Sequence, residues 1–468
     1  MIRLILVIAF LTIGQCQQVF AQDEQLSKKQ MIYDIDCLVE KINYSHPNPY
    51  YYRSKEEWTH YLDSLKNELP ENLSLFGFWR QIDKILVFMN DAHTRSYPTQ
   101  FYKKYVKDGG LFFPFSIENK EGSYTVKKNY SDQTAIDSIN KLVAVNGIPI
   151  EKVVQTLKLQ SSKELDFLDE KYVTASFPYY LWRVYDWRAP YTIDFLDKNG
   201  KTSKMEVQGV LSTALAEKNP ETTEETCKFS ILNDSTALLT IKDFDSEKRS
   251  YFKKFYKTSF KKIDKLKIKN VIIDVRNHDG GDARYGEDLG RYFADKPFRT
   301  SSKTLWKVTP EFKKNFSAMY IPRIMRWAKF TYGINKHTKA IWNTKDNELA
   351  VVEHKLVKPK KSSLQQKRNI YVLIDNYTFS AGSMFAAMVK DYQLGTLVGQ
   401  PTANLSSFYA DPMMWYALPY SKFTFQVSTS LDVRPSGIID TESILPDIEI
   451  EDNEDALQKA IELIQQKR

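Results

Sequence analysis

Two short runs of apolar residues, each followed by a polar turn and a helical pattern, constrain the fold most. They read Val271-Ile-Ile-Asp-Val275 and Ile370-Tyr-Val-Leu-Ile374. Runs of this kind are typical of strands that are buried on both faces, as in parallel sheets. Helical patterns at residues 247–266 and 285–293 flank the first run. The alternation of strand and helix predicts an α/β layered core.

A chain of 468 residues is long enough for two or three domains. Residues 22–100 have helical periodicity and predict a helical domain. Residues 101–215 carry strand and turn signals and predict a β-rich module with a helical insertion near residues 161–187. The layered core then occupies residues 216–468, with a basic, aromatic and mostly helical insertion at about 300–365. Further strands are expected at 398–399, 423–431 and 445–450, and a closing helix at 455–467.

The N-terminus has the pattern of a signal peptide. Arg3 precedes an apolar run at residues 4–13, and Ala21 offers a small residue for cleavage. The run is far shorter than the ~20 apolar residues that a membrane span needs. No later stretch is apolar enough to span a bilayer. We therefore expect residues 1–21 to be removed and the mature chain to be exported, either periplasmic or secreted, with no integral membrane span.

Composition argues against several functional classes. The net charge of +8 is modest, and no nucleic-acid-binding motif accompanies the scattered lysines, so no nucleic acid partner is expected. Cys37 and Cys227 remain after cleavage, and either a disulfide or two separate buried thiols would suit an exported chain. Neither has a metal-ligand spacing, so we expect no metal and no cofactor.

Ser380 is the candidate nucleophile. It lies in Tyr377-Thr-Phe-Ser-Ala-Gly-Ser383, where the second buried strand gives way to a helix. Backbone N–H groups and the positive end of the helix dipole point outward at a helix start. The hydroxyl could therefore attack a carbonyl while the N–H of Ala381 binds the oxyanion. A plain helix N-cap is the alternative interpretation of this serine.

Gly280 and Gly281 end the turn after the first buried strand. Adjacent glycines there indicate positive φ or close backbone approach, and an N–H of either one could complete an oxyanion hole. A plain tight turn is the alternative. Two of the six histidines are candidate bases, His93 just after a predicted helix and His278 within this turn. The remaining four are expected to be structural or at the surface: His46, His60, His337 and His354.

Six segments, taken in order, resemble the core of the S41 peptidases, the family of the carboxy-terminal processing proteases and the tricorn core. The resemblance implies a ClpP/crotonase-like layered core, a PDZ-like module at residues 101–215, and serine endopeptidase activity on protein or peptide substrates. The segments are Asn90-Asp-Ala-His-Thr94, Lys141-Leu-Val-Ala-Val-Asn-Gly-Ile-Pro-Ile150, Asp274-Val-Arg-Asn-His-Asp-Gly-Gly281, Tyr377-Thr-Phe-Ser-Ala-Gly-Ser383, Val398-Gly-Gln-Pro-Thr402 and Gly437-Ile-Ile-Asp-Thr-Glu-Ser-Ile-Leu-Pro-Asp447.

The resemblance also implies which residues act. One branch of the family uses a lysine as the base, but residues 401–407 contain none, and Lys390 lies ~15 Å along the helix from Ser380. The other branch resembles a Ser-His-Glu arrangement, in which His93 matches the histidine. The position of the acid falls on Asp440, with Glu442 as a rival two residues away.

Other functions remain open. Asp440 stands where the family has glutamate, His278 where it has asparagine, and Ala92 where it has glycine. These departures allow a catalytically weak or inactive relative that only binds peptides. An esterase could use the same triad, although the GxSxG motif of the α/β-hydrolases is missing. The segment 131–138 replaces a glycine-rich turn of the PDZ-like module, so peptide capture and a structural role are both possible for that module.

Overall fold

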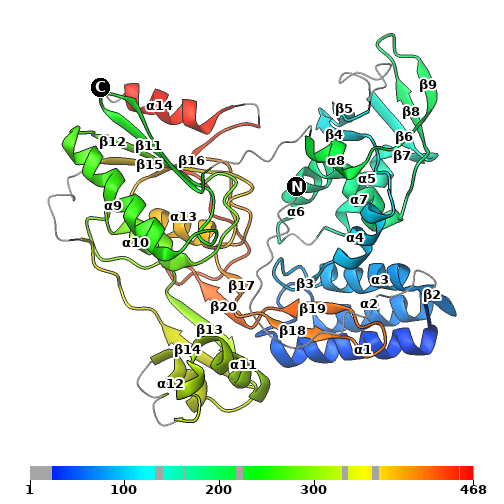
Figure 1. Cartoon of the computed structure of the whole chain (residues 1–468), viewed down its shortest axis with the longest axis horizontal. Coiled ribbons are helices and arrows are strands. Elements are labelled where there is room, and N and C mark those ends of the chain that lie inside the picture. Colours follow the sequence, from blue (N-terminus) through cyan, green and yellow to red (C-terminus); the bar gives the residue numbers. More distant parts are fainter. Residues whose placement is uncertain are drawn as a thin grey trace. The chain divides into compact units, whose positions relative to one another are not determined.

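The computed structural model describes residues 24–131, 141–161, 164–217, 225–328, 332, 336–360, 368–452 and 454–466. The chain folds as two compact units (Figure 1). Unit 1 comprises Met1–Lys41, Pro49–Glu224 and Trp415–Gln426, and unit 2 comprises Ile42–Asn48, Glu225–Met414 and Val427–Arg468. Each unit is described by itself.

A six-stranded sheet forms the centre of unit 2, in the order β10-β11-β12-β15-β16-β21. β10 and β11 pair antiparallel, and every later pair is parallel. The two apolar runs of the sequence are β12 and β15, which lie side by side, so the prediction of buried parallel strands is confirmed. The strand bounds are β10 Cys227–Asn233, β11 Thr236–Ile241, β12 Asn270–Asp274, β15 Asn369–Ile374, β16 Thr396–Gly399 and β21 Ile448–Glu449.

Helices cover both faces of this sheet (Figure 1). Val271 and Ile273 of β12 pack in a core with side chains of the helices on one face. Ile272 points the other way, into a smaller core with the C-terminal helix, because side chains alternate along a strand. The predicted α/β layering is therefore present. The helices are α9 Arg249–Lys265, α10 Ala283–Gly290 and α13 Ala381–Tyr392 on the first face, and α14 Ala456–Gln466 on the second.

The insertion expected to be mostly helical also contains two strands. β13 (Lys303–Lys307) and β14 (Leu349–Glu353) join an antiparallel sheet with the order β14-β13-β20-β17. Helices α11 (Pro310–Tyr320) and α12 (Lys336–Asn343) pack against it, with Trp306 and Phe312 in their shared core. The strands were missed because β13 pairs with β20, which lies far along the sequence.

The single strand expected at residues 423–431 is two strands in different sheets. β19 (Thr424–Val427) pairs with β3 (Arg95–Ser96), whereas β20 (Ser430–Val433) pairs with β13 and with β17 (Phe408–Ala410). This one apolar segment therefore contributes to two sheets, because its two consecutive strands pair with different strands.

Unit 1 contains helices and a β-rich module. The module is a sheet with the order β4-β5-β6-β8-β9, and helix α5 contributes Ile150, Val153 and Leu157 to its core. The strands and helix expected at residues 101–215 are therefore largely present. The bounds are α1 Lys28–Ser45, α2 Lys55–Glu68, α3 Leu75–Phe88, α4 Thr99–Lys107, β4 Phe115–Lys120, β5 Ser123–Asn129, β6 Lys141–Val145, α5 Ile150–Lys158, α6 Asp166–Ala175, β8 Tyr191–Leu196 and β9 Thr202–Val207.

Two sequence predictions lie outside the described residues: the signal peptide at 1–21, and residues 132–138 of the segment that replaces the glycine-rich turn. Cys37 is a half-buried free thiol in unit 1, and Cys227 is a buried free thiol in unit 2. Among the described helices, none has the length and apolar character needed to cross a bilayer.

Candidate active site

Ser380 occupies the turn between β15 and α13, immediately before the first residue of the helix. Its φ is +52° and its ψ is −117°, a conformation that residues other than glycine rarely adopt. The side chain is half-buried and forms no capping hydrogen bond with the helix, so the N-cap interpretation does not describe it. Strained backbone at a helix start is a common feature of reactive sites.

Asn404 holds this turn in place. Its Oδ1 accepts a hydrogen bond of 2.5 Å from the backbone N–H of Ser380, and its side chain is fully buried. The N–H of the adjacent Ala403 donates to the carbonyl of Thr378 at 2.9 Å. Asn404 was not among the residues predicted from the sequence. The sequence feature that could have identified it is a polar residue in the segment 401–407. The family resemblance concerns only whether this segment contains a lysine.

Gly280 lies directly against Ser380. A methyl group added at Gly280 would come within 2.8 Å of the Cβ of Ser380 and 3.3 Å of its Oγ. A methyl group at Gly281 would lie 2.5 Å from the backbone carbonyl carbon of Phe244. The two glycines have φ values of +102° and +113°. Close approach and positive φ therefore both require glycine at these positions.

The N–H groups of this turn differ in what they bind. The N–H of Gly280 donates to Nδ1 of His278 at 3.1 Å. Within the described residues, the N–H groups of Gly281 and Ala381 donate to no protein acceptor. Two unused donors of this kind, one on each loop, could hold a developing oxyanion. The arrangement favours Gly281 over Gly280 as the partner of Ala381.

His278 is a buried support for the turn. Its ring is fully buried and packs edge-on against Phe244, with 4.4 Å between ring centroids. Burial lowers the pKa of His278 to about 4, while the nearby carboxylate of Asp243 acts in the opposite direction. The imidazole is therefore neutral near pH 7 and can accept the hydrogen bond from Gly280. No hydrogen bond joins this ring to Ser380 within the described part of the chain.

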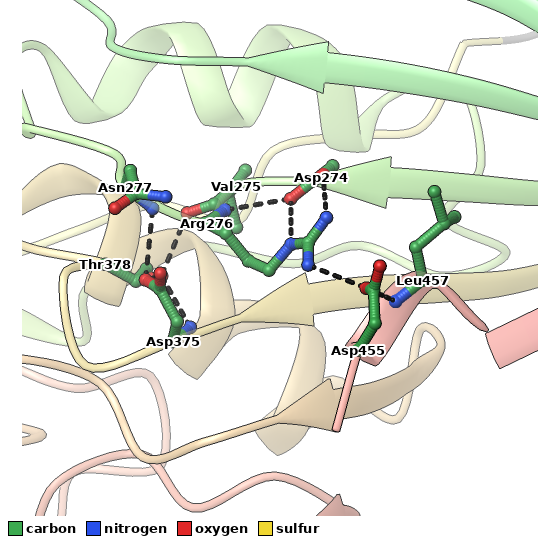
Figure 2. Close-up of polar contacts among 8 residues, drawn as sticks. All are labelled: Asp274, Val275, Arg276, Asn277, Asp375, Thr378, Asp455 and Leu457. Carbon is green, nitrogen blue, oxygen red and sulfur yellow. Dashed lines mark hydrogen bonds and ion pairs between the residues drawn. The ribbon is translucent and has the colours of Figure 1, made fainter. Parts of the chain in front are cut away.

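A polar network joins the loops that follow β12 and β15 (Figure 2). One oxygen of Asp375 accepts hydrogen bonds from the backbone N–H of Asn277 at 3.0 Å and from the hydroxyl of Thr378 at 3.1 Å. The Thr378 hydroxyl shares its single proton between this oxygen and the carbonyl of Val275, which lies 2.9 Å away. These contacts fix the glycine turn relative to the Ser380 turn.

Arg276 extends the network towards the C-terminal helix (Figure 2). Its guanidinium binds the carboxylate of Asp274 at 2.8 Å and that of Asp455 at 3.0 Å. The same oxygen of Asp455 accepts the backbone N–H of Leu457 in the first turn of α14. The Arg276 side chain thus anchors the start of the glycine turn to two elements of the core.

The candidate acids lie on a segment that does not form a regular strand. Oδ1 of Asp440 accepts hydrogen bonds from the hydroxyl of Ser406 at 2.9 Å and from the N–H of Glu442 at 3.1 Å. The side chain of Glu442 is exposed, whereas its backbone is held, since its carbonyl also accepts a hydrogen bond from the N–H of Ser406. Since Ser406 is two residues from Asn404, one segment contacts both the Ser380 turn and Asp440.

His93 belongs to unit 1, whereas all the other proposed site residues belong to unit 2. It lies in the turn between α3 and β3, where Asn90 ends the helix with a φ of +60°. The backbone N–H of His93 donates to Oδ1 of Asp91 at 2.9 Å. Its carbonyl accepts a hydrogen bond of 2.7 Å from the side chain of Gln426 in β19. The turn is therefore anchored within unit 1.

Asp91, His93 and Glu164 form a buried group in the same unit. Each offers one metal-ligand atom, and these three atoms lie within 4.8 Å of one another. A donor set of one imidazole and two carboxylates suits a divalent transition metal. Glu164 was not singled out from the sequence, because it is far from His93 along the chain, and the expectation of no metal stays a prediction. Within the described residues this is the one group of its kind.

Comparison with known proteins places these observations in a family. Residues 235–450 match Peptidase family S41. This part of the chain is an S41 peptidase domain. The matched S41 region contains Gly280, Ser380 and Asp440 but not His93. The enzyme class is that of the serine-type peptidases, as expected from the sequence resemblance.

Solved structures also resemble this chain. A mutant of CPAF matches with a TM-score of 0.62 and 16% identity, covering 90% of this chain and 93% of that chain. Mature CPAF in complex with lactacystin has a TM-score of 0.59 and 14% identity, covering 90% and 94%. The photosystem II D1 C-terminal processing protease has a TM-score of 0.42 and 12% identity, covering 91% and 94%. At these identities the likeness to CPAF shows a shared fold. A comparison with curated proteins finds no match.

Proposed function

We propose that this S41 peptidase is an exported serine endopeptidase that hydrolyses peptide bonds of protein or peptide substrates through an acyl-enzyme. One observation carries the proposal: Ser380 is strained at a helix start, directly against Gly280, with the unused N–H groups of Gly281 and Ala381 on the two adjoining loops. A nucleophile beside preorganised oxyanion donors is what acyl transfer requires.

The proposed reaction has two halves. In the first, the imidazole of His93 takes the proton of the Ser380 hydroxyl as Oγ attacks the peptide carbonyl. The oxyanion is held by the N–H groups of Ala381 and Gly281. His93 then gives the proton to the leaving amine, and the C–N bond breaks. In the second half, water attacks the ester while His93 takes its proton. The C–Oγ bond then breaks, His93 returns the proton to Oγ of Ser380, and the acid product leaves.

Asp440 is the proposed acid that orients and stabilises the imidazolium, with Glu442 as its rival. The support for Asp440 is its anchored position, since Ser406 and the N–H of Glu442 fix one of its oxygens. An acid that fixes an imidazole must itself be fixed. Among the described residues of unit 2, none forms a hydrogen bond that fixes the exposed side chain of Glu442.

A fluorophosphonate probe tests this function because it labels only an activated serine. We expect rapid labelling of the wild-type protein, none of Ser380→Ala, and wild-type labelling of Ser436→Ala, which alters an exposed serine elsewhere in unit 2. Cleavage of casein should be lost in parallel. Slow or absent labelling of the wild type would instead support the inactive, peptide-binding alternative.

The base is tested separately. His93→Ala should lose both labelling and cleavage, while His278→Asn, which keeps an acceptor for the N–H of Gly280, should retain them. Inactivation by His278→Asn together with an active His93→Ala would show that the base has been misassigned. Short-chain esters tested beside peptides distinguish an esterase from a peptidase.

We also propose that residues 216–468 have the ClpP/crotonase-like layering of the family, and that residues 101–215 act as a PDZ-like module. The support for the module is the mixed composition of sheet and helix, with α5 packed on the strands. Modules of this type add a peptide as an extra strand and capture its terminal carboxylate. A peptide with a free carboxylate should bind more tightly than its amide, and equal affinities would exclude tail capture.

A further inference from the structure

An unusual share of the chain's positive charge lies in one segment of unit 2. Residues 301–360 contain 13 of the 66 Lys and Arg residues but only 4 of the 58 Asp and Glu residues, which gives a formal charge of +9. The other residues together carry a formal charge of −1. This segment contains β13, α11, α12 and β14, which gather at one end of unit 2 away from the six-stranded sheet (Figure 1). We name it the basic lobe.

The end of α11 and the residues that follow it expose large apolar side chains. We name residues 319–327 the tip of the basic lobe. Ile324 is 80% exposed and Trp327 is 78% exposed, values seldom left uncovered in a folded domain. They follow the end of α11, in a stretch of nine residues that holds three further exposed apolar side chains. These are Met319 at 57%, Tyr320 at 57% and Met325 at 44%.

The exposed stretch is held in a defined shape. The guanidinium of Arg326 donates to the carbonyl of Ile321 at 2.9 Å and to that of Ala318 at 2.7 Å, and so closes the turn after α11. The N–H of Met325 donates to the carbonyl of Pro322 at 2.8 Å. Ile324 and Trp327 are therefore exposed on a hydrogen-bonded turn, and the exposed Arg323 directly precedes Ile324 in the sequence.

We infer that the tip of the basic lobe docks on an anionic lipid surface. Apolar side chains interleaved with arginine, on a lobe of strong positive charge, suit the boundary between anionic headgroups and acyl chains. Trp327 is of the residue type that prefers this boundary. Three of the five exposed apolar side chains, those of Met319, Ile324 and Met325, are aliphatic and gain more from burial among acyl chains than from contact with bases, so lipid fits better than nucleic acid. Docking would hold the peptidase beside substrates at a membrane surface.

Vesicle co-sedimentation of the full mature chain tests this inference. Vesicles of phosphatidylglycerol and phosphatidylcholine in equal parts should bind the protein, and vesicles of phosphatidylcholine alone should bind it much less. Added salt should weaken binding because exposed charges are screened. Equal binding to both kinds of vesicle, or none to either, would overturn the inference.

The double variant Ile324→Ser/Trp327→Ser removes the two most exposed side chains of the tip. We expect it to lose about tenfold or more in affinity for the anionic vesicles. The double variant Leu159→Ser/Phe167→Ser is its control, since these residues are 73% and 52% exposed in unit 1. The control should bind like the wild type. Arg323→Gln should weaken binding by about fivefold, the contribution of one basic residue near an anionic surface.

Two further measurements distinguish lipid docking from self-association and from damage to the peptidase site. Sedimentation velocity shows whether the tip instead joins two copies of the chain. A dimer that is lost in Ile324→Ser/Trp327→Ser would overturn the lipid proposal. Labelling of Ser380 by the fluorophosphonate probe in solution should be the same in the wild type and in the tip variant, so failure of lipid binding is distinguishable from failure of the proposed peptidase function.

Discussion

The backbone N–H of Gly280 donates a hydrogen bond of 3.1 Å to Nδ1 of the buried His278. The same glycine lies against Ser380, so the imidazole supports the backbone that faces the nucleophile. Only a neutral imidazole can accept this bond, and burial keeps His278 neutral near pH 7. One side chain therefore fixes the direction of the Gly280–Gly281 turn without itself contacting the serine through a hydrogen bond.

This relationship predicts how stability depends on pH. The pKa of His278 falls from 6.5 to about 4 on folding. Between these two pH values the imidazole is therefore mostly protonated in the unfolded chain and mostly neutral in the folded chain. Above pH 6.5 the ionisation of His278 should not change the free energy of unfolding. That free energy should fall as the pH decreases towards 4, by about 3 kcal/mol in all. Urea unfolding at several pH values measures the loss.

His278→Asn is the informative variant for this prediction. Asparagine keeps an acceptor for the N–H of Gly280 but cannot titrate, so the pH dependence should become shallower while activity is retained. The remaining dependence should include His354, whose pKa burial also lowers to about 4. His278→Leu removes the acceptor and should lower kcat by about ten- to a hundredfold with little change in KM. An unchanged pH dependence in His278→Asn would contradict the proposal.

Gly280→Ala should abolish most of the activity. The added methyl group would lie 2.8 Å from the Cβ of Ser380, closer than real contacts allow, and alanine is strained at a φ of +102°. Gly122→Ala is the matched control, because Gly122 also has a positive φ but has nothing within 4 Å of an added methyl group.

The control should therefore lose about 1 kcal/mol of stability from strain alone and keep full activity. Casein cleavage and thermal unfolding of both variants separate crowding at Ser380 from general strain. Similar losses of activity in the two variants would show that crowding is not the cause.

Asp440→Asn and Glu442→Gln distinguish the two candidate acids. Asparagine at position 440 leaves the side chain nearly unchanged in shape but removes the charge that stabilises an imidazolium. We expect it to lower kcat by about two to four orders of magnitude. Glu442→Gln should change kcat by only a few-fold, because that side chain is exposed. Steady-state kinetics on one peptide substrate would decide, and the reverse ranking would assign the role to Glu442.

Metal removal and addition should have different effects. We expect EDTA to leave the labelling of Ser380 unchanged, because acyl transfer is proposed to use only side chains and backbone N–H groups. Added Zn²⁺ should slow labelling if it binds the imidazole of His93 together with Asp91 and Glu164. Glu164→Gln should then need more Zn²⁺ for the same effect. Inhibition by EDTA would contradict a mechanism without metal.

Local patterns predicted much of the layered core. The strand-turn-helix around Ser380 and the glycine turn after β12 were both found from residues that are adjacent in sequence, because periodicity and turn chemistry act over a few residues. The strands β13 and β14 were missed within the same unit. Each of these strands has only five residues, which is too short for a clear local pattern. In addition, β13 is part of its sheet because it pairs with β20, which lies far along the chain.

The sequence by itself determined which residues could do chemistry and which elements would carry them, since a serine at a helix start and two adjacent glycines after a buried strand are local features. Only the tertiary structure decided what holds them. Asn404 on the N–H of Ser380, Ser406 on Asp440 and Glu164 beside His93 all come from segments far from the groups they approach. Such partners depend on how strands and loops meet in space, because hydrogen bonds and burial act over a few ångströms regardless of distance along the chain.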